Sequence, residues 1–376
     1  MTASLRQAAG SLLVVGLGGT ELTGLERAWL KLVRPSGIIL FRLNIADAAQ
    51  VRALLGAATG LCSLHSLRCV DVEGGLVDRL RDALAPMPSA KAVAKAVRPS
   101  SQRPGLEHTA GPARQHGDLV ARAVKAFGVN TTLAPVLDLA LPVSAEVMGT
   151  RTAATTAAGV VEYARGFLTG LATQGVVGCG KHFPGLGGGT SDSHQETPAI
   201  RRTFRKIWRE DLAPYRELRD AMPMVMVNHA AYPDTLGPGT SLGRPASVSR
   251  FWITTVLRNR IGYNGLILSD NFEMGGILKF MPIEEAVIEA VLAGMNLVEI
   301  CHSPELILRA FEALITEGER SKAFRDLLTA RARQTARQRA RHFAGEIPAA
   351  LSARQFEALR TRILRFGEKI AKGQRA

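Results

Sequence analysis

The feature that most constrains the fold is an alternation of short apolar runs with segments of helical periodicity, repeated along most of the chain. Eight runs rich in β-branched residues and bounded by Gly, Pro or Asn predict strands. These runs are residues 12–16, 37–41, 67–72, 129–137, 176–182, 222–228, 265–270 and 296–301. Apolar residues at helical spacing predict helices between them. The clearest helical segments are residues 25–33, 46–54, 118–127, 158–171, 208–219 and 283–292.

Eight such repeats predict an α/β fold of the TIM (β/α)8 type, in which parallel strands close into a barrel inside a ring of helices. The 376 residues exceed the roughly 250 of a typical barrel. We expect a barrel domain over residues 1–343 and a C-terminal helical tail over 344–376, with a separate helix over 353–371. A doubly wound dinucleotide-binding fold is disfavoured, because its G-x-G-x-x-G fingerprint requires Gly where the chain has Glu21.

The excess of basic residues is concentrated in the C-terminal part of the chain. The formal net charge is +14, and residues 318–376 contain 15 Lys and Arg against 5 Asp and Glu, which leaves +4 for the rest. The arginines between residues 331 and 341 predict one long basic helix with a solvated face. Aromatic residues make up only 5% and are not interleaved with basic ones. Nucleic acid is therefore not an expected partner.

The cysteines and the N-terminus bear on the cellular compartment. Cys62, Cys69, Cys179 and Cys301 show no C-x-x-C spacing, which predicts buried free thiols in a reducing environment. No apolar run reaches the ~18 residues of a membrane helix. Residues 8–17 resemble a short signal peptide but also provide the first strand that the barrel needs to close. We therefore expect a cytoplasmic protein.

Polar residues follow six of the predicted strands. In a TIM barrel the loops after the strands converge on one mouth, where the chemistry takes place. The polar groups lie in the segments 71–75, 149–151, 181–182, 228–229, 269–271 and 301–302. A single polar residue at a strand end is commonly structural, but six in succession predict an active site.

The loop after the fifth predicted strand is rich in glycine and contains Asp192 and His194. In an extended segment, side chains two residues apart point the same way. A carboxylate beside an imidazole fixes its tautomer and raises its basicity, as a general acid/base pair requires. A metal site explains the histidines less well than an acid/base pair does, because the chain has no H-E-x-x-H motif and no carboxylate triad at fixed spacing. An aldolase-like barrel with Lys181 as a Schiff-base amine is a further alternative, but it assigns no role to Asp192 and His194.

Two motifs together carry a family resemblance. The run Lys181-His182-Phe183-Pro184-Gly185 with Asp192-Ser193-His194, joined to residues 71–75 and to Ser269-Asp270, resembles the family 3 glycoside hydrolases of the β-N-acetylglucosaminidase type, the NagZ-like enzymes of peptidoglycan recycling. The resemblance extends from about residue 12 to about residue 341.

The resemblance implies a retaining exo-β-N-acetylglucosaminidase that releases GlcNAc from anhydro-muropeptides. Asp270 would form a covalent glycosyl-enzyme, and His194 paired with Asp192 would protonate the leaving oxygen and then activate water. The substrate hydroxyls would be held or positioned by a further set of polar residues. These are Asp71, Arg79, Arg151, Lys181, His182 and His229. Neither a metal nor an organic cofactor is implied, and the oligomeric state is not determined.

Four positions depart from the family pattern, and they leave alternatives open. Leu186, Val72, Leu76 and Asn271 stand where the family has or often has polar or charged residues. A β-N-acetylglucosaminide phosphorylase, a β-glucosidase and a non-catalytic muropeptide-binding relic therefore remain as alternatives. Glu299 is an unusual charge within an apolar run and has no assigned role.

Overall fold

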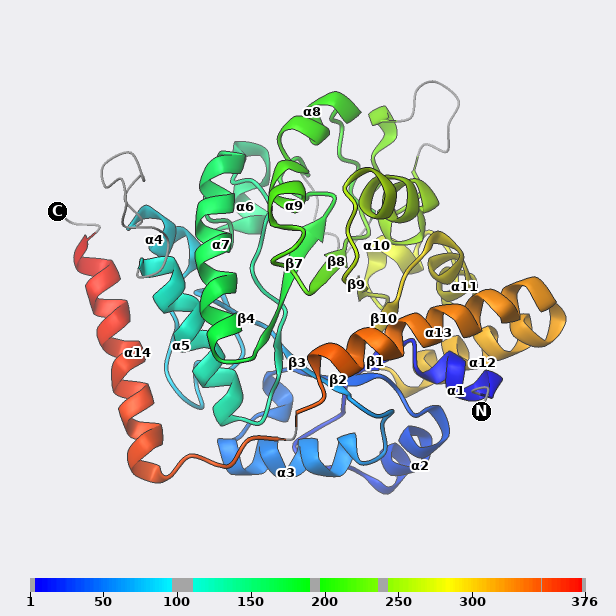
Figure 1. Cartoon of the computed structure of the whole chain (residues 1–376), viewed down its shortest axis with the longest axis horizontal. Helices are drawn as coiled ribbons and strands as arrows, with labels where there is room; N and C mark the ends of the chain where they lie inside the picture. Colours follow the sequence, from blue (N-terminus) through cyan, green and yellow to red (C-terminus); the bar gives the residue numbers. More distant parts are fainter. Residues whose placement is uncertain (1–3, 97–110, 190–196, 236–242, 346, 374–376) are drawn as a thin grey trace.

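The computed structural model describes residues 4–96, 111–189, 197–235, 243–345 and 347–373, and it shows a closed parallel barrel (Figure 1). The strands follow the order β1-β10-β9-β8-β7-β6-β3-β2 around the barrel. They are β1 (Leu13–Val15), β2 (Gly37–Leu40), β3 (Leu67–Val70), β6 (Thr131–Thr132), β7 (Val177–Phe183), β8 (Met224–Val227), β9 (Leu266–Asn271) and β10 (Leu297–Ile300). The predicted TIM-type barrel is confirmed.

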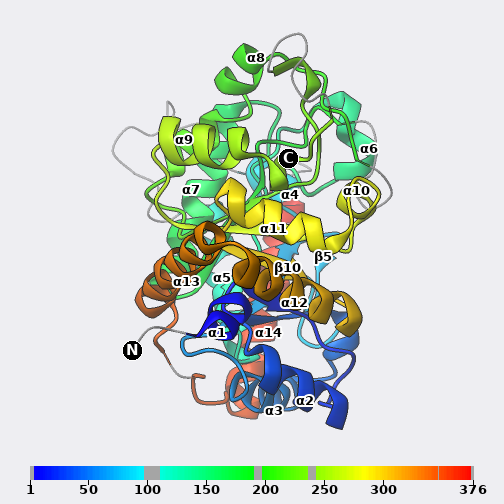
Figure 2. The same cartoon turned by 90° about the vertical axis from the view of Figure 1, so that its right-hand side faces the viewer.

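Helices surround the barrel, as the two views at right angles show (Figures 1 and 2). The α-helices are α1 (Leu5–Gly10), α2 (Gly24–Val33), α3 (Ala48–Thr59), α4 (Ala90–Lys95), α5 (Pro112–Ala126), α6 (Ala145–Met148), α7 (Ala157–Thr173), α8 (Phe204–Arg209), α9 (Ala213–Leu218), α10 (Gly275–Leu278), α11 (Ile283–Ala293), α12 (Pro304–Arg320), α13 (Lys322–His342) and α14 (Ala353–Gly373). Shorter helical turns are η1 (Arg42–Asn44), η3 (Pro142–Ser144), η4 (Pro233–Thr235) and η5 (Ala246–Val248), and the π-helix η6 spans Phe251–Arg260.

The strand side chains separate into two apolar clusters. Successive residues of a strand point to opposite faces, so one set packs outward under the helices and the other fills the barrel lumen. The lumen cluster includes Val14, Ile39, Leu67, Cys69, Leu133, Val177, Cys179, Met224, Met226, Leu266, Leu268, Leu297 and Cys301. The lumen is therefore a packed core, and the polar groups lie above it at the carboxyl ends of the strands.

Two predicted strands are shorter than expected. The strand expected over residues 129–137 is only β6, and Pro135 lies just beyond it. A proline has no N–H to donate to a sheet ladder, and beyond it only Val136 bridges to β7. The strand expected over residues 67–72 ends at Val70. Val72 instead begins β4 (Val72–Gly74), which pairs antiparallel with β5 (Val77–Asp78).

The helix expected over residues 208–219 is divided into α8 and α9. Pro214 lies in the first turn of α9, where a missing N–H is tolerated, but within one continuous helix it would remove a hydrogen bond. The helix expected over 118–127 is the second part of the longer α5, which begins with Pro112.

β1 pairs with both β2 and β10, so residues near the N-terminus close the barrel. None of the described helices is long and apolar enough to span a membrane. The four cysteines are buried and free, as predicted.

Two helices carry most of the basic C-terminal region. On α13, Arg333, Arg337 and Arg341 are exposed, as expected for a solvated face, but Arg339 is buried. Burial lowers the pKa of Arg339 to about 10. The helix expected over residues 353–371 is α14, which lies along α5 and α4 (Figure 1). Its side chains Leu359, Ile363, Phe366 and Ile370 join the main apolar core.

We expect Phe366→Ala to lower the free energy of unfolding by about 3 kcal/mol, because a buried aromatic ring is removed. Phe366 lies 6.0 Å from the ring of His116 on α5, centroid to centroid. Urea unfolding measures the effect. Leu364→Ala is the matched control, because Leu364 is 42% exposed on the same helix and its loss should cost less than about 0.5 kcal/mol. Equal effects of the two substitutions would show that α14 is not held by its apolar face.

Candidate active site

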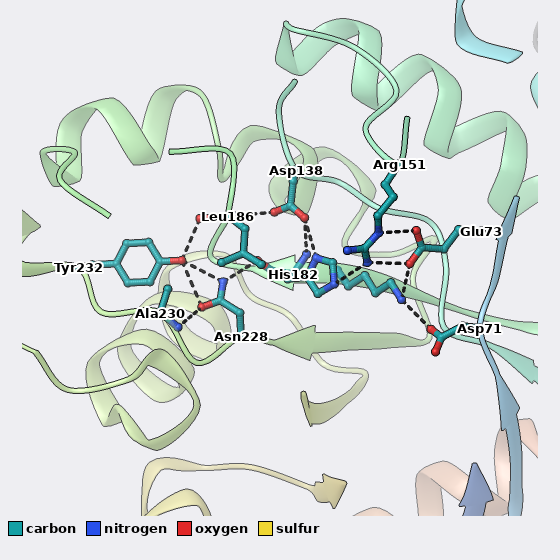
Figure 3. A network of polar contacts seen from close by, with 11 residues as sticks. Asp71, Glu73, Asp138, Arg151, His182, Leu186, Asn228, Ala230 and Tyr232 are labelled. Atoms are coloured by element: carbon teal, nitrogen blue, oxygen red, sulfur yellow. Dashed lines mark hydrogen bonds and ion pairs between the residues drawn. The ribbon is translucent and has the colours of Figure 1, made fainter. Parts of the chain in front are cut away.

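A buried ion-pair network lies at the ends of β3 and β7 (Figure 3). Nζ of Lys181 donates to Oδ1 of Asp71 at 2.8 Å and lies 2.7 Å from Oε1 of Glu73. The Arg151 guanidinium donates to both Glu73 oxygens, each at 2.9 Å. Such bidentate, charge-assisted bonds fix both partners in one geometry. Asp71, Arg151 and Lys181 are thus brought together, and Glu73 is the residue that joins them.

The cations determine the ionisation of Glu73. Burial on its own would raise the pKa of this carboxyl, but Arg151 and Lys181 outweigh it and hold the pKa far below its usual range. The carboxylates of Asp71 and Glu73 in turn raise the pKa of Lys181, although burial on its own would lower it. Lys181 is therefore a permanent cation, which does not suit the neutral amine that a Schiff base needs.

His182 connects this network to Asp138. Nδ1 of His182 lies 2.7 Å from Oδ2 of Asp138, and its Nε2 lies 3.3 Å from Nη2 of Arg151. A guanidinium can only donate. In the neutral ring, Nε2 therefore accepts from Arg151, and Nδ1 carries the proton that it donates to Asp138.

Asp138 also holds the start of the glycine-rich loop. Its Oδ1 accepts from the backbone N–H of Leu186 at 2.6 Å, and its Oδ2 accepts from the backbone N–H of His182. Asn228, at the end of β8, donates to the backbone oxygen of His182 and to the Tyr232 hydroxyl, which donates to the Gly185 oxygen (Figure 3). The loop therefore leaves β7 on a rigid support.

Asp270 lies near the end of β9, with its Oδ1 accepting from the backbone N–H of Asn271 at 2.9 Å. Burial would raise the pKa of Asp270, but the imidazoles of His182 and His229 and this hydrogen bond lower it overall. Asp270 therefore favours its carboxylate form, the form that its predicted role as nucleophile requires.

His229 and Arg79 are held by protein partners. Nδ1 of His229 lies 2.8 Å from the Ser247 hydroxyl, and its Nε2 lies 3.0 Å from the Asn271 backbone oxygen, so this ring supports the turn beside Asp270. The Arg79 guanidinium lies 3.8 Å from Oδ2 of Asp71.

Asp192 and His194 lie outside the described residues. Their assignment as a general acid/base pair therefore stays a prediction. Thr197, just beyond this stretch, donates its hydroxyl to the Gly276 backbone oxygen in α10 at 2.7 Å.

Three of the four positions that depart from the family pattern lie close to the network. Leu76, at the tip of the β4–β5 hairpin, is 62% exposed, and its Cδ1 lies 3.1 Å from the point where a Cβ on Gly149 would be. Leu186 is bound to Asp138 through its backbone, and Val72 is buried in β4. None of the three side chains takes part in an ion pair of the described network.

Sequence reasoning did not assign Glu73 or Asp138 to the site. Glu73 stands two residues after Asp71, and Asp138 ends an apolar run, so both carried the same signal as the residues that were chosen. Their partners, Arg151 and His182, are 78 and 44 residues away in the chain, and only folding brings them together. In the part of the chain that the structure describes, no three His, Cys, Asp or Glu side chains are grouped to hold a metal ion.

We expect Glu73→Ala to lower the free energy of unfolding at pH 7 by about 3–5 kcal/mol, because it leaves two buried cations without their shared carboxylate. The folded-state pKa of Glu73 is depressed, so its contribution is present above the unfolded pKa and is lost as the pH falls toward the folded one. The difference between the two proteins should therefore shrink below about pH 4. Urea unfolding across pH measures it.

Glu285→Ala is the control for Glu73→Ala, because Glu285 is exposed on α11. A loss below about 0.5 kcal/mol is expected for this variant. A Glu73→Ala variant as stable as the Glu285 variant at pH 7 would contradict the role of the network.

Comparisons with known proteins identify the family of the chain. Residues 4–346 match the glycosyl hydrolase family 3 N-terminal domain. A β-hexosaminidase of Alkalilimnicola ehrlichii is 36% identical over 297 residues, covering 78% of this chain and 82% of that protein. NagZ from Neisseria gonorrhoeae has a TM-score of 0.76 at 27% identity, covering 95% of this chain and 98% of that one.

A family 3 β-N-acetylglucosaminidase from Paenibacillus sp. has a TM-score of 0.83 at 28% identity, covering 97% of this chain and 69% of that one. The family resemblance found in the sequence is thus confirmed by a domain match over most of the chain. The chain belongs to glycosyl hydrolase family 3 and is a glycoside hydrolase.

Proposed function

We propose that this chain is a retaining exo-β-N-acetylglucosaminidase that releases terminal β-linked GlcNAc from peptidoglycan fragments in the cytoplasm. The observation that carries the proposal is the position of an ionised Asp270 beside the buried network of Asp71, Lys181 and Arg151. Charged side chains bind sugar hydroxyls strongly and hold the ring in one orientation. The β-hexosaminidase and NagZ relatives support the same sugar class.

The chemistry proceeds in two steps. Asp270 attacks the anomeric carbon, and its new bond to the sugar replaces the bond to the leaving oxygen, which takes a proton from His194. In the second step His194, oriented by Asp192, removes a proton from water, which attacks the same carbon and releases Asp270. The two inversions leave the product with the β configuration of the substrate.

The loop that contains His194 begins and ends beside the site. Asp138 binds its first residues at Leu186, and Thr197 binds Gly276, which follows the strand that carries Asp270. Asp138 follows β6 and Gly276 lies in α10 after β9, so the two anchors stand beyond different strands of the barrel, which supports a catalytic role for the segment between them.

The test is hydrolysis of chromogenic β-GlcNAc and β-glucose glycosides, with the anomer of the first product followed by NMR. We expect a strong preference for β-GlcNAc glycosides, β-GlcNAc as the first product, and release of GlcNAc from anhydro-muropeptides. Equal activity on β-glucose would identify a β-glucosidase. Sugar 1-phosphate as the main product in phosphate buffer would identify a phosphorylase, and tight GlcNAc binding without turnover would identify a binding protein.

A further inference from the structure

Glu299 is a carboxyl group that points into the barrel lumen. It lies in β10 between Leu297 and Cys301, which both belong to the lumen cluster. The residues that alternate with it, Val298 and Ile300, pack in the outer cluster under the helices. By the two-residue period of a strand, the Glu299 side chain therefore faces the inside of the barrel.

The Glu299 carboxyl has no protein partner for one of its oxygens. The residue is 2% exposed, and its Oε1 is buried without a hydrogen bond among the described residues. Burying a polar atom without a partner costs roughly 1–3 kcal/mol. A group that carries this cost in an otherwise apolar lumen needs an explanation beyond packing.

The charges nearest to Glu299 belong to the active site. Asp270 and Asp71 raise its pKa together with burial, which is the largest cause, and Lys181 only partly opposes them. Lys181 is already bound to Asp71 and Glu73, so it is not available as a counter-ion. These surroundings favour the neutral form of Glu299 more than in an ordinary glutamate, and a neutral carboxyl has one O–H donor and one carbonyl acceptor.

Glu299 also lies level with Asp270 along the barrel strands. β10 pairs with β9, with Glu299 opposite Asn271, the residue after Asp270. The backbone N–H of Glu299 donates to the Ser269 hydroxyl at 3.0 Å, and its backbone oxygen accepts from Phe272 at 2.8 Å. The main chain on both sides of the carboxyl is therefore fixed to the strand and turn that carry Asp270.

We propose that Glu299 is a further sugar-binding residue, whose carboxyl hydrogen-bonds a hydroxyl of the ring held over Asp270. A neutral acid can both donate to and accept from a hydroxyl, which matches the unpaired oxygen at the base of a site otherwise lined by charged groups. This inference rests on the proposed function, because it requires that a sugar occupies the pocket. It adds a specificity-determining contact from β10, on the opposite side of Asp270 from β8.

The first experiment compares Glu299→Gln with Glu299→Leu. Gln keeps a donor and an acceptor, so kcat/KM on the best glycoside should stay within about 3-fold of wild type. Leu removes both, so kcat/KM should fall about 10- to 100-fold. The melting temperature of the Leu variant should be equal to or above that of wild type, because an unpaired buried carboxyl is removed. Ile300→Val, on the outer face of the same strand, is the control and should leave kcat/KM unchanged.

The second experiment identifies the hydroxyl and separates the inference from the proposed function. Binding of GlcNAc and its 3-, 4- and 6-deoxy analogues is measured by calorimetry for wild type and Glu299→Leu. One deoxy analogue should bind to the wild type more weakly than GlcNAc does. The same analogue and GlcNAc should bind to the Leu variant with equal affinity. If the wild type acts on β-glucosides instead, the proposed function is wrong and the same series is measured with glucose.

Two results would overturn the assignment. One is a Leu variant with wild-type kcat/KM and sugar affinity, which would show that the carboxyl faces only water or protein. The other is a Leu variant that is weakened equally by each missing hydroxyl, which would show a general disturbance of the pocket.

Discussion

Replacing Asp270 with Ala is expected to lower kcat on a β-GlcNAc glycoside by about 10⁴-fold or more, because the covalent route is lost with its nucleophile. The Asp270→Asn variant should show an equal loss of kcat, since the amide keeps the size of the side chain but not its charge. The measurement is steady-state hydrolysis of a chromogenic β-GlcNAc glycoside with freshly purified protein. Retention of more than about 1% of kcat by both variants would exclude Asp270 as the nucleophile.

The ionisation of Asp270 provides an independent check by pH. Because His182 and His229 lower the pKa of Asp270 despite its burial, its protonation should not reduce kcat/KM until the pH falls below the ordinary aspartate range. Any acid limb of kcat/KM at higher pH must then come from another group. Both Asp270 variants should unfold at about the temperature of the wild type, which separates a loss of chemistry from a loss of fold.

Replacing His194 with Ala is expected to lower kcat/KM on a substrate with a poor leaving group by about 10²- to 10⁴-fold, the usual contribution of a general acid. A substrate with a much more acidic phenol needs little protonation, so its first step should be nearly normal and the enzyme should accumulate as the glycosyl-Asp270 intermediate. Rapid-mixing measurements of phenol release should then show a burst followed by slow turnover.

An external nucleophile provides the control for His194. Azide needs no general base, so it should accelerate the slow second step in the His194 variant and yield a β-glycosyl azide. It should have no such effect on the Asp270 variants, which form no intermediate. A His194 variant whose loss is the same for good and poor leaving groups, and which azide does not rescue, would contradict the acid/base role.

The site illustrates which residues sequence reasoning can find. Asp71, Lys181 and Asp270 stand at strand ends, and the barrel brings such ends to one mouth, so their proximity could be predicted once the fold was inferred. Glu73 and Asp138 stand in equally polar positions, and nothing in the sequence separates them from residues at the rim of the barrel. Their importance depends on which cation or imidazole each one contacts, and that depends on the backbone path of a hairpin and a loop.

The element boundaries illustrate a similar limit. Alternation of apolar runs predicted all eight barrel strands, because each strand must bury side chains on both faces of a parallel sheet. It could not locate the ends of β6 or the break between α8 and α9. The apolar run continues through Pro135 and Pro214 in the sequence, but β6 ends at Thr132 and a new helix, α9, begins at Ala213.

The sequence by itself determined the barrel, its family and the strand ends from which the polar groups project, because strand periodicity and motif spacing are local properties of the chain. Only the tertiary structure decided how those groups pair. Lys181 contacts two carboxylates, Arg151 lies against Nε2 of His182, and one oxygen of the Glu299 carboxyl has no hydrogen-bond partner among the described residues. Charge pairing acts over a few ångströms between residues distant in the chain, so it follows from packing and not from sequence order.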